Sequence, residues 1–277
     1  MEESSTRVLR EPPLTREPKI GCIGYGKEGV RVPKFYYDLH MHSCLSPCAE
    51  DDMTPASMAG LAALNGLQIA ALTDHNSCGN LAAFFAACRA YGVVPIAGME
   101  LETAESVHLV CLFPKYDDAM DFWQVVRTEH MMPFKNDPAV FGNQLYMNVD
   151  DEVLGEEETL LITSTMLSID DAVPLVRAHG GFVFPAHIDR TSNGIIAILG
   201  DLPPEPGFTL VEFNDSANVA PYREQYAAVR ELPVLVNSDA HRLMDINDAV
   251  NYIELDADPS DEDAVRKAFF AYLKGDR

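Results

Sequence analysis

The chain is poor in basic residues. Its 277 residues include 20 Lys and Arg against 43 Asp and Glu, which gives a net charge of −23. A surface of this charge repels nucleic-acid backbones at long range, so extended nucleic acid is disfavoured as a partner. A small phosphorylated substrate stays open, because divalent cations bound in a pocket can reverse the local potential.

The chain also lacks long apolar runs. No segment approaches the length of a membrane span, so no membrane partner is expected. Residues 1–34 are polar and contain several prolines, without the apolar core of a secretory signal, and we expect a flexible tail there. The six cysteines are therefore expected to be free thiols or metal ligands in a cytoplasmic protein. The sequence carries no signal for an oligomeric state.

Short apolar runs alternate with helical patterns along the rest of the chain, which is 47% apolar overall. The expected strands are 35–39, 69–72, 93–98, 107–113, 181–184, 210–213, 234–236 and 251–255. The expected helices begin at Thr54-Pro55 and cover 80–90, 117–131, 168–179, 220–230 and 260–274.

This alternation predicts a parallel sheet of seven or eight strands. A (β/α) barrel is the first choice at this length, and a doubly wound open sheet is the second. We expect one domain over residues 35–277. The irregular, acidic segment 132–165 is expected to be an insertion or a lid within it.

Histidines gather at the ends of the expected strands. His40 and His42 follow the first strand, and residues two apart on a strand share a face. In a barrel, chemistry is found at the carboxyl ends of the strands. Five of the eight histidines close apolar strands in this way: His40, His42, His75, His187 and His241.

A cluster of buried imidazoles needs partners for its ring nitrogens, and several metal ions meet that need together. Carboxylates at strand ends, including Glu100 and Asp239, would complete such a site, because imidazole and carboxylate bind Zn, Mn and Fe. His130 and His179 lie in expected helices and are given no role. His108 begins a strand, so its position alone leaves its role ambiguous.

Six motifs, taken together, resemble one known family. They are DLHMHS at 38–43, LTDHN at 72–76, AGME at 97–100, VHLVCLF at 107–113, PAHIDR at 185–190 and NSDAH at 237–241. In this order they resemble the PHP (polymerase and histidinol phosphatase) superfamily of metal-dependent phosphoesterases. The resemblance implies a distorted (β/α)7 TIM-like barrel of the PHP type that binds two or three divalent metal ions.

The resemblance also implies the ligands. It assigns the first metal to His40, His42, Glu100 and Asp239; the second to Glu100, His108 and His187; and the third to His75 and His241. Cys48 stands where many members of the family carry a further histidine ligand. A thiolate binds Zn or Fe well and Mg poorly, so either Cys48 replaces that histidine or the third site is weak or empty. Cys48 could also be a small buried residue without a ligand role.

The expected activity is hydrolysis of phosphate esters of small metabolites or nucleotides, with a metal-bridging hydroxide as the nucleophile. Arg190 follows His187 by three residues and is expected to clamp phosphate oxygens, with Arg242 as the alternative. Asp74, Asp189 or the third metal could assist the leaving group. The alternatives are an amidohydrolase-type metal hydrolase, a nuclease acting on oligonucleotide ends, and a PHP-like module without activity.

Overall fold

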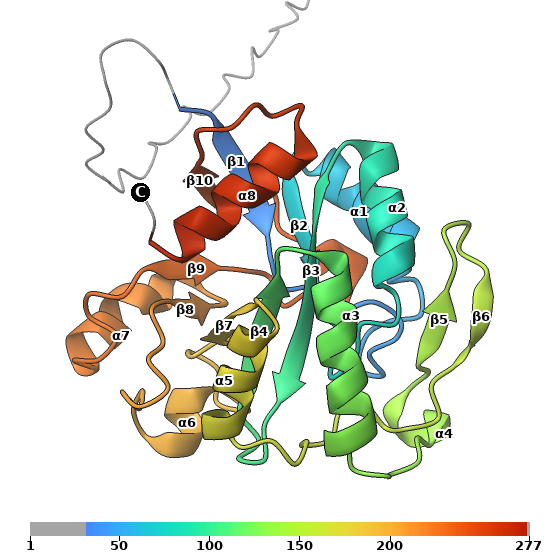
Figure 1. The fold of residues 1–277 in the computed structure, drawn as a ribbon, viewed down its shortest axis with the longest axis horizontal. Helices are drawn as coiled ribbons and strands as arrows, with labels where there is room; N and C mark the ends of the chain where they lie inside the picture. Colours follow the sequence, from blue (N-terminus) through green and yellow to red (C-terminus); the bar gives the residue numbers. More distant parts are fainter. Residues whose placement is uncertain (1–31, 276–277) are drawn as a thin grey trace, which may run out of the picture. The chain divides into compact units, whose positions relative to one another are not determined.

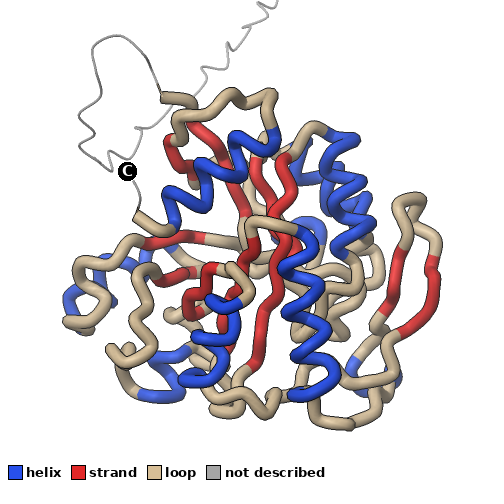
Figure 2. Tube along the Cα trace, viewed as in Figure 1, coloured by secondary structure: helices blue, strands red, loops and turns tan. Residues whose placement is uncertain are grey.

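The computed structural model describes residues 32–275. The expected tail, 1–34, therefore lies almost entirely outside the described residues, and the first strand already begins at Lys34. Within the described part, strands form the centre and helices lie around them (Figure 2). No helix of the described residues is long and apolar enough to cross a membrane.

Six strands form the main sheet, in the order β10-β1-β2-β3-β4-β7 (Figure 1). Their bounds are β1 Lys34–Asp38, β2 Ile69–Leu72, β3 Val94–Glu102, β4 His108–Phe113, β7 Phe182–Pro185 and β10 Tyr252–Glu254. The strands β8 Val211–Phe213 and β9 Val234–Val236 form a separate parallel pair. All eight expected strands are present, within a few residues of their expected ends.

The expectation of a parallel sheet is wrong at two places. β1, β2, β3 run parallel, but β4 runs antiparallel to both β3 and β7, and β10 runs antiparallel to β1. β3 and β4 form a hairpin because only residues 103–107 connect them, too few for a crossover helix. The amino end of β4 therefore lies at the same end of the sheet as the carboxyl end of β3.

The pair β8–β9 closes the curled sheet into a distorted barrel with few backbone bonds. On one side the Ile188 amide, just past β7, donates to the Glu212 carbonyl in β8 at 2.9 Å. On the other side the His42 amide, just past β1, donates to the Ala240 carbonyl at 2.9 Å. The Asn237 side chain adds a bond from the Leu39 amide at 3.0 Å. These bonds complete the barrel that the sequence predicts.

Helices cover the outside of the barrel (Figures 1 and 2). Their bounds are α1 Pro55–Leu64, α2 Leu81–Tyr91, α3 Tyr116–Val125, α5 Ile169–Ala178, α6 Ile195–Leu199, α7 Val219–Gln225 and α8 Glu262–Leu273, with the π-helical turn η1 Val126–His130 and the 3-10 turns η2 Ser216–Asn218 and η3 Leu243–Asp245. Thr54 caps α1 by accepting from the Ser57 amide, as its sequence predicts. The expected helix 220–230 is too long, because the chain is extended at Tyr226.

Alternate strand residues enter two separate cores, as a half-buried pleat requires. One core packs strand residues such as Met99 against outer helices through Phe84 and Phe122. The other fills the barrel interior with residues such as Ile96 and is closed by Phe269 of α8. In Figure 1, α8 crosses the end of the sheet opposite to the carboxyl ends of β1, β2 and β3. That leaves the carboxyl end for polar residues.

The segment 132–165 contains structure that the sequence did not predict. It holds the short helix α4 Pro138–Phe141 and the hairpin of β5 Leu145–Met147 with β6 Val153–Glu156. Figure 1 shows this hairpin projecting beside α2 and α3. Its base is anchored by Asn80, which donates to the Leu145 carbonyl at 3.0 Å and accepts from the Met147 amide at 2.9 Å.

Candidate metal centre

His40 and His42 extend from the end of β1 toward two carboxylates. The Nε2 atoms of the two histidines lie 3.1 Å apart. His40 Nε2 is 3.2 Å from Glu100 Oε1, and His42 Nε2 is 3.2 Å from Asp239 Oδ1. Glu100 comes from β3 and Asp239 from the loop after β9. These four side chains form a compact group in which a single metal ion could be bound.

The hydrogen bonds behind these histidines fix their tautomers. His40 Nδ1 lies 2.8 Å from Glu212 Oε1, a carboxylate oxygen that can only accept, so Nδ1 carries the hydrogen. His42 Nδ1 lies 3.1 Å from the Ser46 hydroxyl, which itself donates to Asp74 at 2.8 Å, so this Nδ1 also carries the hydrogen. Both Nε2 atoms are therefore directed to the same point, and each can offer a lone pair to a cation once it carries no hydrogen.

A second group centres on Glu100. Its carboxylate oxygens lie 2.9 Å from His75 Nδ1, 2.9 Å from His108 Nδ1 and 3.0 Å from His187 Nε2. His108 reaches this group because β4 is antiparallel and begins at the rim of the barrel. The antiparallel strand thus explains why strand position alone left His108 ambiguous.

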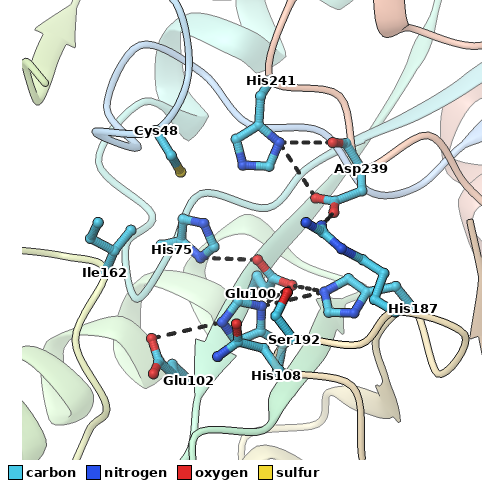
Figure 3. Close-up of a pocket in the computed structure, with 12 residues that line it drawn as sticks. Cys48, His75, Glu100, Glu102, His108, Ile162, His187, Ser192, Asp239 and His241 are labelled. Atoms are coloured by element: carbon cyan, nitrogen blue, oxygen red, sulfur yellow. Dashed lines mark hydrogen bonds and ion pairs between the residues drawn. The ribbon is translucent and has the colours of Figure 1, made fainter. Parts of the chain in front are cut away.

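A third group shares His42 with the first. His42, His75 and His241 bring their ring nitrogens within 4.8 Å of one another. Figure 3 shows Cys48 pointing toward His75 and His241. Cys48 is exposed, so it is not the small buried residue that the sequence allowed as an alternative. The five cysteines of the described residues form no disulfide.

The charge states of Glu100 and His241 suit cations, whereas His108 must release a proton before it can bind one. Burial opposes the ionised form of Glu100, but the charges of His108, His40 and His75 hold the pKa of Glu100 well below its ordinary value. Burial, together with repulsion from His42, lowers the pKa of His241 to about 3. Burial lowers the pKa of His108 too, but the neighbouring Glu100 carboxylate outweighs it and raises this pKa to about 9. Glu100 is thus ionised and His241 neutral at pH 7.

Unsatisfied polar atoms give a test of whether metal ions fit here. Seven buried side-chain polar atoms of the described residues lack a hydrogen-bond partner, and four of them belong to this cluster: His75 Nδ1, Glu100 Oε2, His187 Nδ1 and Asp239 Oδ1. His75 Nδ1 and Glu100 Oε2 lie 2.9 Å apart without the alignment of a hydrogen bond. The atoms of His75, Glu100 and Asp239 face other members of the cluster, and buried atoms of this kind are costly unless a cation binds them, so these residues fit divalent metal ions.

A cavity of about 300 Å³ opens onto the cluster. Its lining residues are Cys48, His75, Glu100, Glu102, His108, Ile162, His187, Arg190, Ser192, Asn193, Asp239 and His241. Arg190 donates to Asp239 Oδ2 and keeps 44% of its side chain exposed, so part of its guanidinium is free to bind a ligand.

Three residues considered from the sequence do not line the cavity. Asp74 is buried, with its oxygens accepting from the Ser43 hydroxyl at 2.7 Å and the Ser46 hydroxyl at 2.8 Å. Arg242 is directed to Glu50, whose oxygen lies 3.0 Å from its Nε, and 67% of its side chain is exposed. Asp189 accepts from the amides of Asn214 and Asp215 at 3.0 Å, which stabilises a loop.

The PHP domain family model matches residues 38–201 of the chain. The chain belongs to the PHP domain family. The match covers the motifs around His40, His75, Glu100, His108 and His187 and ends before Asp239 and His241. No curated protein matches the chain at a significant level.

Solved structures similar to this PHP domain share its fold at low sequence identity. The lesion-specific endonuclease EndoQ from Pyrococcus furiosus has a TM-score of 0.58 at 19% identity, over 88% of this chain and 56% of that chain. A protein from Bifidobacterium adolescentis described as a metal-dependent phosphoesterase has a TM-score of 0.55 at 18% identity, over 87% of this chain and 97% of the other. An amidohydrolase from Chromobacterium violaceum has a TM-score of 0.52 at 20% identity, over 79% and 91%.

These neighbours correct one expectation. Endonuclease Q has also been solved with a 27-mer duplex, with a TM-score of 0.52 at 17% identity to this chain, over 88% of this chain and 57% of that one. A nucleic-acid substrate is therefore possible for a protein of this fold, against the expectation that extended nucleic acid is disfavoured. The chain spans just over half the length of the endonuclease, so activities of the whole endonuclease do not transfer directly.

Two supporting residues of the PHP site escaped the sequence interpretation. Glu212 is fully buried in β8 and accepts from His40 Nδ1, from the His187 amide at 3.0 Å and from Asn237 Nδ2 at 2.7 Å. Ser46 links His42 to Asp74. A lone acidic residue inside the apolar run 210–213 was the available signal for Glu212, because a buried carboxylate needs partners.

The backbone is strained at two residues of the cluster. His187 has φ 26° and Asp239 has φ 53°, a region that residues other than glycine rarely adopt. Such conformations cost on the order of 1–3 kcal/mol each and persist where surrounding contacts enforce them, often at functional sites. Here they turn two side chains inward at strand ends.

Proposed function

We propose that this PHP-domain hydrolase cleaves phosphate esters of small metabolites or nucleotides, with Zn, Mn or Fe ions bound by the cluster. The observation that supports this most directly is that the Nε2 atoms of His40 and His42 meet the carboxylates of Glu100 and Asp239, beside the partly free Arg190. Divalent ions bound there would neutralise phosphate charge and lower the pKa of a bound water.

The residues of the chain supply binding and orientation. Arg190 can donate to phosphate oxygens from its exposed nitrogens while it stays paired with Asp239. We place Asp74 among the positioning residues, because its carboxylate fixes Ser46 and through it His42. Arg242, paired with Glu50 outside the cavity, is given no phosphate contact.

The proposed activity has a direct test. Protein loaded with Mn or Zn should release phosphate from an aryl phosphate or from nucleoside monophosphates, and His40→Ala and Asp239→Ala should lose this activity. His130→Ala is the matched control, because His130 ends the turn η1 and does not belong to the cluster. Full activity of both cluster variants in metal-replete protein would refute the proposal.

Cys48 is proposed as a thiolate ligand beside His75 and His241. The support for this is geometric: Cys48 lines the same cavity as His75 and His241 and points toward both (Figure 3). A thiolate would favour Zn or Fe over Mg at this position.

Cobalt substitution tests this ligand independently of activity. Co(II)-loaded protein should show a thiolate-to-cobalt charge-transfer band in the near ultraviolet, and Cys48→Ser should lose it. Cys44→Ser is the control, because Cys44 is buried and its thiol donates to the Leu145 carbonyl. An unchanged band in Cys48→Ser would show that the thiol is not a ligand.

A nuclease acting on oligonucleotide ends is the second candidate, supported by the likeness to EndoQ. The same metals and Arg190 would serve a phosphodiester, so parallel assays on a 5′-phosphorylated oligonucleotide and on a nucleoside monophosphate separate the two. The amidohydrolase alternative is weaker, since the cavity lining within the described residues includes no lysine that could be carboxylated to bind metals.

A further inference from the structure

One apolar side chain stands in an otherwise polar cavity. Of the twelve side chains that line it within the described residues, Ile162 is the only one made entirely of hydrocarbon. Figure 3 shows Ile162 at the edge of the cavity, on the side of His75 and Cys48 and across the cluster from His187. It is half-buried, so part of its surface is available for a contact.

Two side-chain amides fix the backbone on both sides of Ile162. Asn76 Nδ2 donates to the Leu161 carbonyl at 2.7 Å and to the Thr163 carbonyl at 3.0 Å. Gln144 Oε1 accepts from the Leu161 amide at 2.8 Å. Both amide side chains are buried, so these bonds are protected from water.

Three further hydrogen bonds join the same segment to the barrel. The Thr165 amide and hydroxyl both donate to the Glu102 carbonyl, at 2.9 and 2.8 Å. The Ser164 hydroxyl donates to the Glu102 carboxylate at 2.9 Å. These bonds tie this part of the 132–165 segment to the barrel, where it forms one wall of the cavity and positions Ile162.

The opposite end of the cavity is lined by charged and metal-binding side chains. Arg190 and the histidine–carboxylate cluster would hold a phosphoryl group, and the leaving group must then extend toward the cavity edge. Ser192 also lines the cavity, close to Glu100 and His108 (Figure 3), and no hydrogen bond of its hydroxyl is present within the described residues. A leaving group in the cavity can therefore contact the hydrocarbon side chain of Ile162 and the hydroxyl of Ser192.

We infer that Ile162 packs against the leaving group and selects phosphate esters with a ring-shaped, partly apolar leaving group, aryl or nucleoside, over esters of small polyols. This inference rests on the proposed phosphoesterase function. Rigid presentation matters, because a contact that is already ordered before binding costs no further entropy when the substrate arrives.

The test compares two substrates in one enzyme. The metal-loaded protein is assayed with an aryl phosphate and with glycerol 1-phosphate, and kcat and KM are measured for each. Ile162→Ala should lower kcat/KM for the aryl ester roughly tenfold, chiefly through KM, and leave the glycerol ester within about twofold, because a few methyl groups in an apolar contact are worth that discrimination. Ile162→Leu should retain the preference.

Ile198→Ala is the matched control, because Ile198 lies on α6, is 44% exposed and does not line the cavity. Metal content and thermal unfolding of Ile162→Ala show whether the cluster and fold are intact. Equal loss on both substrates, or no loss on either, overturns the role of Ile162 while leaving the phosphoesterase function standing. Absence of phosphate release by the wild-type protein from every ester refutes the proposed function itself.

Discussion

Replacing Glu212 by glutamine should weaken metal binding although Glu212 touches no metal. The carboxylate of Glu212 accepts three hydrogen bonds: one oxygen from His40 Nδ1 at 2.8 Å and the His187 amide at 3.0 Å, the other from Asn237 Nδ2 at 2.7 Å. Glutamine keeps one accepting oxygen and turns an NH₂ group toward a partner that also donates. At least one of these bonds must therefore be lost.

The magnitude follows from the role of the lost bond. A partner that orients a ligating histidine is typically worth 10- to 100-fold in metal affinity, which is about 1.4–2.7 kcal/mol. The same change leaves a buried donor unsatisfied, and that costs about 1–3 kcal/mol of folding free energy. Competition with a chelator of known affinity measures the first quantity, and denaturant unfolding measures the second.

Glu254→Gln is the matched control, because Glu254 is an exposed residue of β10 with no partner at the cluster. If Glu212→Gln binds Zn and Mn as tightly as the wild type does, then Glu212 does not orient His40. The assignment of the hydrogen to His40 Nδ1 would then also lose its support.

Three further predictions concern stabilisation by metal ions, the reactivity of two thiols and the steric role of one glycine. Adding Zn or Mn at a hundred times its dissociation constant should stabilise metal-free protein by about 2.7 kcal/mol, or roughly 5–10 °C in Tm, and His40→Ala should abolish most of this shift in a thermal scan. Burial raises the pKa of Cys44 to about 12, so at pH 8 it stays a protonated thiol and should resist alkylation, while exposed Cys48 reacts and is protected by metal; peptide mapping distinguishes them. Gly142→Ala should lower the free energy of unfolding by on the order of 2–4 kcal/mol, because Gly142 has φ 101° and a Cβ there would collide with the Pro47 carbonyl. Gly207→Ala, with φ 65° and open space around it, should cost clearly less, and equal losses would contradict the steric argument.

The sequence predicted the strands well because each is a short apolar run between turn residues. It could not predict the direction of β4, since a strand reads the same in either direction. The length of the 103–107 connection was the available signal, because five residues cannot form a crossover. Reading that length would have placed His108 at the rim without the family resemblance.

Residues that support the site through contacts with distant parts of the sequence were harder to predict. Glu212 and His40 are separated by 172 positions and meet only because the barrel closes. The wall that holds Ile162 depends on Asn76 and Gln144, whose polarity looks ordinary in the sequence. Patterns along the chain indicate where ligands stand, whereas contacts between distant segments decide which side chains support them.

The weak closure of the barrel has a consequence for its dynamics. β8 and β9 join their neighbours through single backbone bonds at each seam, while the side chains of Glu212 and Asn237 cross the same seams beside His40. Binding of metal by His40 and Asp239 would therefore also fasten β9 to β1. In the metal-free protein, amide hydrogens of 211–213 and 234–236 should exchange with solvent earlier than those of β2 and β3. The ion would then hold β9 against β1, and its loss would let the barrel open between these two strands.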